Sequence, residues 1–131
     1  MSTAPTSPTA LCVTFHGVRG SIATPGPDTV EFGGNTSCVE VQAGGQTLIF
    51  DTGTGVRLLG QKLLRERAAR GERGPISAAI FFSHVHWDHI QGLPFFSPMY
   101  QKGNRFNVYA RRRDDTHLRA VFASQSDTPY F

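Results

Sequence analysis

Three apolar stretches near the start of the chain alternate with turn residues in the way that β-strands do. Residues 11–17, 36–42 and 46–53 combine β-branched and aromatic side chains, and residues 43–45 (Ala-Gly-Gly) predict a hairpin between the last two. Residues 76–83 form a nearly unbroken apolar run, which predicts a strand covered on both faces. Residues 105–110 predict one more strand.

Residues 55–70 predict an amphipathic helix that stops at Gly71. Its apolar positions fall on one stripe, with Arg, Lys and Glu opposite: Val56, Leu59, Leu63 and Leu64. A short second helix is predicted over residues 114–124, with Asp114 or Asp115 as its cap. Residues 1–10 have no periodicity and predict a flexible tail, so residues 11–131 are expected to form one α/β domain.

Composition fits a globular domain, with 39% hydrophobic and 18% charged residues among 131. Thirteen basic and 10 acidic residues give a net charge of +3, which permits an anionic substrate but is far from the basic stripe of a nucleic-acid module. Arg111, Arg112 and Arg113 are interpreted as a solvated turn, so nucleic acid is not the expected partner. No membrane span or secretory signal is visible, and a cytoplasmic protein is expected. Cys12 and Cys38 are interpreted as small buried side chains, with a disulfide as the alternative.

Four metal-capable side chains fall within six residues at the end of the apolar run: His84, His86, Asp88 and His89. In an extended chain residues i and i+2 point to the same side, so His84 and His86 can face one ion. A turn would then bring Asp88 and His89 toward a second position. Two ions about 3.5 to 4 Å apart can hold a bridging hydroxide and polarise a phosphoryl or carbonyl oxygen. The alternative is a cluster of surface histidines.

This HxHxDH segment resembles the signature of the metallo-β-lactamase superfamily. Residues 15–41, 48–60 and 82–100 are similar to its phosphodiesterase-like branch, which includes ribonuclease Z. The resemblance implies an αββα sandwich and hydrolysis of a phosphodiester or related ester. It also implies two Zn²⁺ ions, with Mn²⁺ or Fe²⁺ in some members. His84 and His86 match ligands of the first metal, and Asp88 and His89 match ligands of the second, with Asp88 also orienting the nucleophile.

The resemblance also suggests residues that support such a site. Asp51 matches an acidic residue that hydrogen-bonds a ligand histidine, although capping the next helix is the alternative. Asn35 could brace the site in the same way or could be an ordinary turn residue. Arg19 could bind a substrate phosphate or could be a structural loop arginine. Trp87, Phe95 and Phe96 are interpreted as packing groups under the metal loop, with substrate stacking as the lesser option.

The family's remaining ligands, two histidines and a bridging aspartate, come from later motifs that the chain does not reach. His117 lies too early to replace them and is interpreted as a surface residue. The fold expected is therefore the N-terminal half of the sandwich, a mixed sheet with helices and one uncovered apolar face, which predicts a partner or aggregation.

Two functions from different classes follow. The first is a dinuclear hydrolase of a small phosphodiester or nucleotide-like substrate, active once a complementing C-terminal half or a homo-oligomer supplies the missing ligands. The alternative is an inactive truncated remnant or interaction module that binds metal weakly. A third, a redox or nucleic-acid-binding module, depends on the basic residues alone.

Overall fold

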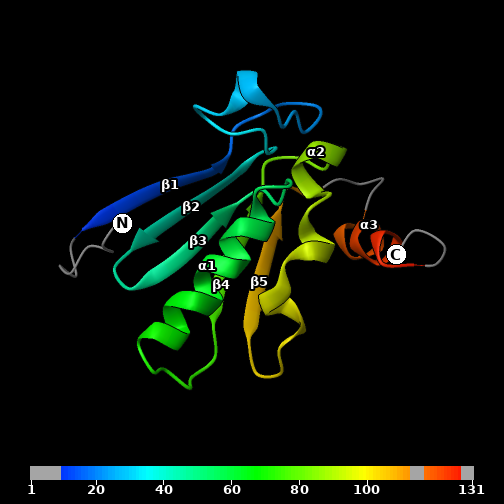
Figure 1. The fold of residues 1–131 in the computed structure, drawn as a ribbon. Helices are drawn as coiled ribbons and strands as arrows, with labels where there is room; N and C mark the ends of the chain where they lie inside the picture. The colour runs from blue at the N-terminus through cyan, green and yellow to red at the C-terminus, as the bar shows by residue number, and fades with distance from the viewer. Residues whose placement is uncertain (1–9, 113–116, 128–131) are drawn as a thin grey trace.

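Five strands form one mixed sheet in the computed structural model, which describes residues 10–112 and 117–127 (Figure 1). In sheet order they are β1 (Leu11–Gly17), β2 (Cys38–Ala43), β3 (Gln46–Phe50), β4 (Ser77–Phe82) and β5 (Arg105–Ala110). The first three strands pair antiparallel, whereas β4 is parallel to both β3 and β5. The fold is therefore α/β, as predicted.

Helices connect and flank these strands. The long helix α1 (Val56–Ala69) joins β3 to β4, and α3 (Leu118–Gln125) follows β5. Four short elements occupy loops: η1 (Pro27–Thr29) between β1 and β2, then α2 (Trp87–Ile90), η2 (Leu93–Phe95) and η3 (Ser97–Tyr100) between β4 and β5. None of the helices in the described part of the chain is both long enough and apolar enough to cross a bilayer.

The predictions for β1, β5 and α1 are confirmed. Gly71 ends α1 with φ of +65°, a left-handed conformation that glycine adopts without strain. The predicted strands 36–42 and 46–53 become residues 38–43 and 46–50, because Asp51 leaves the strand with φ of +62°. The strand predicted over residues 76–83 spans Ser77–Phe82.

The predicted start of the last helix is wrong. It begins at Leu118 with His117 at its N-cap, and His117 is exposed, as predicted. Asp114, Asp115 and Arg113 lie outside the described residues, as do residues 1–9 of the predicted tail.

The hydrophobic core lies between one face of the sheet and α1, which crosses in front of the strands in Figure 1. Ile49, Ile80 and Phe82 on the sheet are buried together with Val56, Leu59 and Leu63 on the helix, whereas Leu64 is only half-buried. Cys38 is buried as predicted and Cys12 is half-buried. Both cysteines are free, so the alternative of a disulfide between them is wrong.

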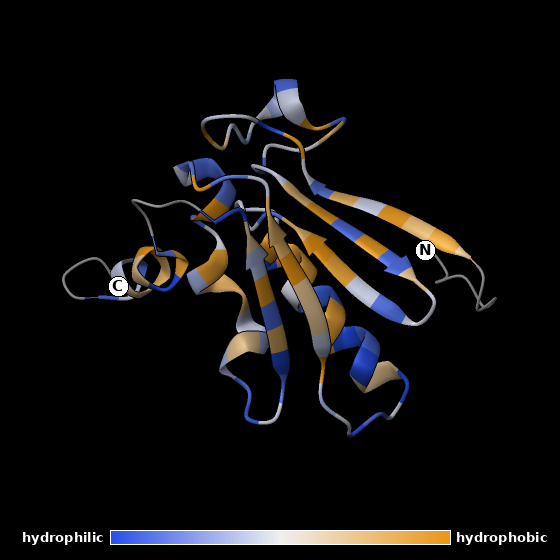
Figure 2. Cartoon of the chain, turned by 180° about the vertical axis from the view of Figure 1, so that it is seen from behind, coloured by the Kyte–Doolittle hydropathy of each residue, from blue (hydrophilic) through white to orange (hydrophobic). Residues whose placement is uncertain are grey.

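The opposite face of the sheet has no covering layer among the described residues. In Figure 2 the strands face the viewer and α1 lies behind them. The pairing register places five apolar side chains in one row across this face: Phe15, Val39, Phe50, Phe81 and Tyr109. The rings of Phe81 stack on those of Phe50 and Tyr109 with centroids 5.3 and 5.0 Å apart. The expectation that β4 is covered on both faces is therefore wrong, and the uncovered apolar face matches the one expected of half a sandwich.

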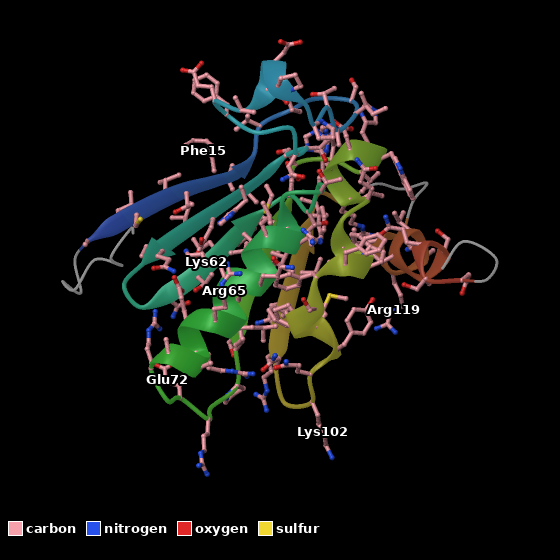
Figure 3. The ribbon with its side chains drawn as sticks, in the orientation of Figure 1. Phe15, Lys62, Arg65, Glu72, Lys102 and Arg119 are labelled. Atoms are coloured by element: carbon pink, nitrogen blue, oxygen red, sulfur yellow. The ribbon has the colours of Figure 1, made fainter. Side chains whose placement is uncertain are left out.

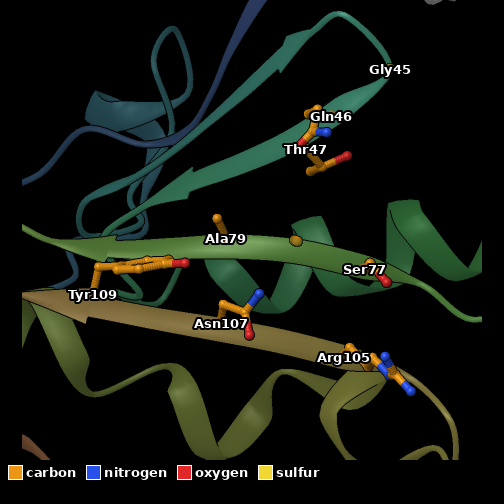
Figure 4. Close-up of a pocket in the computed structure, with 9 residues that line it drawn as sticks. Gly45, Gln46, Thr47, Ser77, Ala79, Arg105, Asn107 and Tyr109 are labelled. Carbon is orange, nitrogen blue, oxygen red and sulfur yellow. The ribbon is translucent and has the colours of Figure 1, made fainter.

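A pocket of about 340 Å³ opens near the amino-terminal ends of β4 and β5 (Figure 4). Its lining includes Gln46, Ser77, Arg105 and Asn107. The histidine segment follows the carboxyl end of β4, so this pocket is separate from the candidate site.

A buried carboxylate joins α1 to the sheet on the covered side. The side chain of Glu40 is 1% exposed, and its Oε2 lies 2.6 Å from Lys62 Nζ and 2.8 Å from His16 Nε2. Figure 3 shows Lys62 on α1 beside the strands. Burial works to raise the pKa of Glu40, but the hydrogen bonds from His16 and Lys62 outweigh it and lower this pKa to about 2.

Replacing Glu40 with Gln should reduce the dependence of stability on pH. Because the folded-state pKa lies below the usual 4.5, the carboxylate stabilises the fold above pH 4.5, and this contribution is lost as the pH falls toward 2. The loss amounts to up to about 3 kcal/mol. Urea unfolding of Glu40→Gln and of the exposed control Glu72→Gln between pH 2 and 7 measures it. Equal pH dependence in the two variants would contradict the burial argument.

Candidate functional site

The candidate site forms where β3 and β4 end side by side. These strands are parallel, so Asp51, directly after β3, and Ser83, directly after β4, lie at the same edge of the sheet. β1 pairs antiparallel with β2, as β3 does, so the β1–β2 connection also begins at this edge. Three segments distant in sequence therefore meet there.

The Asp51 carboxylate accepts hydrogen bonds from both sides of the site. Ser83 donates to it twice, from the backbone N–H at 2.8 Å and from the hydroxyl at 2.7 Å. His89 Nδ1 lies 2.8 Å from the same carboxylate. An ionised carboxylate can only accept, so the contact favours a proton on Nδ1; in the neutral ring with that tautomer, Nε2 is the atom that could bind a metal.

His84 and His86 lie ring against ring, with His84 Nε2 3.0 Å from His86 Nδ1. The Ser83 hydroxyl, which donates to Asp51, lies 3.0 Å from His84 Nδ1 and must accept the proton carried there. In a neutral His84 with this tautomer, Nε2 accepts the hydrogen bond from His86 Nδ1. Both rings are exposed. The backbone of His86 is extended, and α2 begins at the next residue.

Asp88 and His89 form a second pair after the chain turns into α2. Asp88 Oδ2 lies 3.4 Å from His89 Nε2, and it accepts a hydrogen bond of 2.8 Å from the backbone N–H of Ser21. This bond from Ser21 is the main cause that lowers the pKa of Asp88 below its usual value. The carboxylate is thus held beside the imidazole by Ser21, which lies 67 residues earlier in the chain.

These two pairs fit metal ligation in donor type and in spacing. Nitrogen ligands about 2.0 Å from a tetrahedral zinc lie about 3.3 Å from one another, close to the separations in both pairs. Each pair offers two donors. Within residues 10–112 and 117–127 no group of three or more His, Cys, Asp or Glu side chains is arranged to hold one ion. His86 would also have to move its proton from Nδ1 to Nε2 before ligating.

Backbone strain is concentrated at this site. Among the described residues other than glycine, only Ser21 and Asp51 have positive φ, 67° and 62°. Both hydrogen-bond a member of the histidine segment. Residues held in this conformation cost free energy and gather at functional sites, where the surrounding structure fixes them.

The loops below the site are joined by backbone and hydroxyl contacts. Thr36 and Thr54 each donate a backbone N–H to the other's hydroxyl at 2.8 Å, and the backbone N–H of Thr52 donates to His89 O at 2.7 Å. Gly53 lies where these loops cross, and a Cβ there would clash with the carbonyl of Asp88 and with Thr36.

Asn35 and Arg19 are not brought into contact with the histidines. Asn35 Oδ1 accepts from the Thr54 hydroxyl at 3.0 Å, and Arg19 Nε donates to the carbonyl of Gly33 at 3.0 Å. In the part of the chain that the structure describes, no hydrogen bond joins either side chain to His84, His86 or His89. Their predicted roles, bracing and phosphate binding, stay predictions.

The packing prediction holds for Phe96, which is fully buried, but is wrong for Trp87 and Phe95, which are exposed.

The sequence analysis did not identify Ser83 and Ser21 as residues of the site. Ser83 adjoins the motif at a strand end and could have been considered, because its hydroxyl can both donate and accept a hydrogen bond. Nothing in the sequence near Ser21 indicates its contact with Asp88, which forms only through the fold.

Comparisons with known proteins agree with this fold. Residues 32–103, more than half of the chain, match the family model of the metallo-beta-lactamase superfamily. Over 125 residues the chain is 30% identical to a ribonuclease Z of Natronomonas pharaonis, covering 93% of this chain and 36% of that protein. A crystal structure of a new diphosphatase from the PhnP family superposes with a TM-score of 0.55 at 25% identity, covering 88% of this chain and 47% of that one. The chain therefore spans between a third and a half of these relatives' length.

Asp51→Asn should loosen the site without straining the backbone, because Asn adopts positive φ readily. Weaker hydrogen bonds to Ser83 and His89 should lower the free energy of unfolding by about 1 to 3 kcal/mol. Urea unfolding measures this, with Asp28→Asn at an exposed position as the matched control. If both variants unfold like the parent chain, the Asp51 carboxylate does not hold these loops together.

Proposed function

The chain belongs to the metallo-β-lactamase superfamily, and we propose that it supplies half of a dinuclear metal site that hydrolyses phosphodiesters or related phosphate esters. The proposal depends on two pairs of possible metal ligands. His84 Nε2 lies 3.0 Å from His86 Nδ1, and Asp88 Oδ2 lies 3.4 Å from His89 Nε2. Members of this superfamily generally bind divalent metals. Zn²⁺ is the ion proposed here, because imidazole and carboxylate donors suit it, with Mn²⁺ or Fe²⁺ as alternatives.

In this proposal each pair serves one metal position. His84 would ligate through Nε2 and His86 through Nδ1, while Asp88 Oδ2 and His89 Nε2 would hold the second position. The bound ions would supply Lewis-acid activation of the attacking water and of the phosphoryl oxygen.

The other side chains would keep these donors in the correct protonation state. Asp51 fixes the proton of His89 on Nδ1, and Ser83 fixes that of His84 on Nδ1, so each ring presents Nε2. Ser21 holds one carboxylate oxygen of Asp88, which leaves the other available to orient the attacking water. Asp88 is therefore proposed as the catalytic residue.

The substrate class is proposed from the relatives. One is a ribonuclease and the other a diphosphatase. Both names refer to hydrolysis at a phosphate group, which supports a small phosphodiester or nucleotide-like substrate. Because one relative is a ribonuclease, RNA is also a candidate substrate. The charge of the chain had led us to expect no nucleic-acid partner, and the relatives do not support that expectation.

The remaining ligands are proposed to come from outside residues 1–131. The relatives are two to three times as long as the matched region, and the uncovered sheet face offers a surface on which further chain could pack. A complementing C-terminal half is therefore the proposed partner, with a homo-oligomer as the alternative.

A complementation assay tests the proposal. The chain is mixed with the part of the PhnP-family diphosphatase that it does not match, and hydrolysis of bis(p-nitrophenyl) phosphate is followed with Zn²⁺ or Mn²⁺. We expect cleavage that needs both parts and stops with chelator. His86→Ala should lower the rate by about 100-fold or more. Replacing a residue that only hydrogen-bonds a metal ligand already lowers metal affinity or activity by about 10- to 100-fold.

His117→Ala is the matched control, because this histidine is exposed and lies outside the motif. It should leave the rate unchanged. A mixture that forms a stable complex and binds zinc, yet shows no chelator-sensitive cleavage, would overturn the proposed activity.

A further inference from the structure

Trp87 is exposed although it lies between two residues of the metal motif. Its side chain is 63% exposed, whereas the next residue, Asp88, is 9% exposed. It is also the chain's one tryptophan. A tryptophan can bury 150 to 250 Å² of mostly apolar surface, and leaving it in water forgoes that stabilisation. At the start of α2 this side chain is therefore available to a ligand.

Two further exposed apolar residues lie close in sequence to Ser21, whose backbone contacts the Asp88 carboxylate. The backbone N–H of Ser21 bonds to Asp88 Oδ2 at 2.8 Å, so the chain around Ser21 lies against the motif. Ile22, the next residue, is 67% exposed, and Val18 is 46% exposed. In Figure 1 this β1–β2 connection lies at the edge of the sheet where α2 begins.

The connection is held in a fixed shape by its own hydrogen bonds. The backbone N–H groups of Val18 and Arg19 both donate to the carbonyl of Asn35, at 3.0 and 2.9 Å. Thr24 N–H donates to Gly34 O at 2.8 Å. Val18 and Ile22 are therefore presented on an ordered loop, and a ligand that buries them would not have to pay for ordering it.

We infer that Val18, Ile22 and Trp87 form an apolar rim that binds the organic group of the ester while the donor pairs face its phosphate. This rests on the proposed function and extends it to substrate choice. The three side chains carry no charge, and a tryptophan face stacks well on an aromatic ring or a nucleobase. The rim therefore favours phosphodiesters with an aryl or nucleoside group over those with small alkyl groups.

Binding of two phosphodiesters to the zinc-loaded chain tests the inference. Diphenyl phosphate and dimethyl phosphate carry the same charge and differ in their organic groups. Isothermal titration calorimetry should give about tenfold tighter binding of the diphenyl ester, as expected for one stacked ring. In Trp87→Ala and Ile22→Ser this preference should fall below about threefold, whereas Trp87→Phe should restore most of it.

Met99→Ala is the control, since Met99 is exposed on η3 and outside the rim; it should keep the preference. Equal binding of the two esters, or a preference that survives Trp87→Ala, would overturn the rim and leave the proposed hydrolysis standing. Loss of zinc binding in His86→Ala, measured in the same titrations, reports on the proposed metal site separately. Absence of any phosphodiester binding to a chain that does bind zinc would overturn the rim as well.

Discussion

The Asp51 carboxylate is the contact on which the candidate site depends. It lies at the end of β3, and the parallel pairing of β3 with β4 places it against Ser83 and the histidine segment that follows. Through Ser83 it orients His84, and by direct contact it orients His89. One side chain thus contacts one imidazole directly and a second through the Ser83 hydroxyl. Its positive φ of 62° is the local cost of this arrangement.

Local patterns in the sequence are enough to predict most of the elements. β1 and β5 follow their apolar runs to the residue, and α1 follows its stripe until Gly71. The start of α3 was misplaced because an acidic residue that resembles a cap is a weak signal without the contacts of the helix. Periodicity predicts which positions repeat along one element, and such predictions need no tertiary information.

Contacts between distant segments could not be predicted in this way. The motif itself indicated His84, His86, Asp88 and His89, but the Ser21 contact with Asp88 and the exposure of Trp87 depend on how the loops pack. The buried Glu40 was missed as well. It lies in a strand, β2, and only the fold brings Lys62 and His16 to it. Hydrogen bonds between residues far apart in the chain cannot be predicted from the pattern of neighbouring residues.

One face of the sheet is covered by α1, and the other face has no covering layer among the described residues. Toward α1 the strands bury a core and a paired carboxylate, and the opposite face presents a row of aromatic rings. The two ligand pairs follow the carboxyl end of β4, at the edge of the sheet. This arrangement is what links the proposed metal site to a covering partner: the surface that would bind the partner and the site that would be completed by it adjoin.

A long-range ¹H–¹⁵N NMR spectrum of the histidine side chains, recorded before and after zinc is added, tests the two donor pairs most directly. The geometry predicts zinc shifts at Nε2 of His84, Nδ1 of His86 and Nε2 of His89, with the proton of His86 moving from Nδ1 to Nε2 and that of His89 staying on Nδ1. Zinc shifts confined to His117 or His16, or ligation through Nδ1 of His89, would contradict the account.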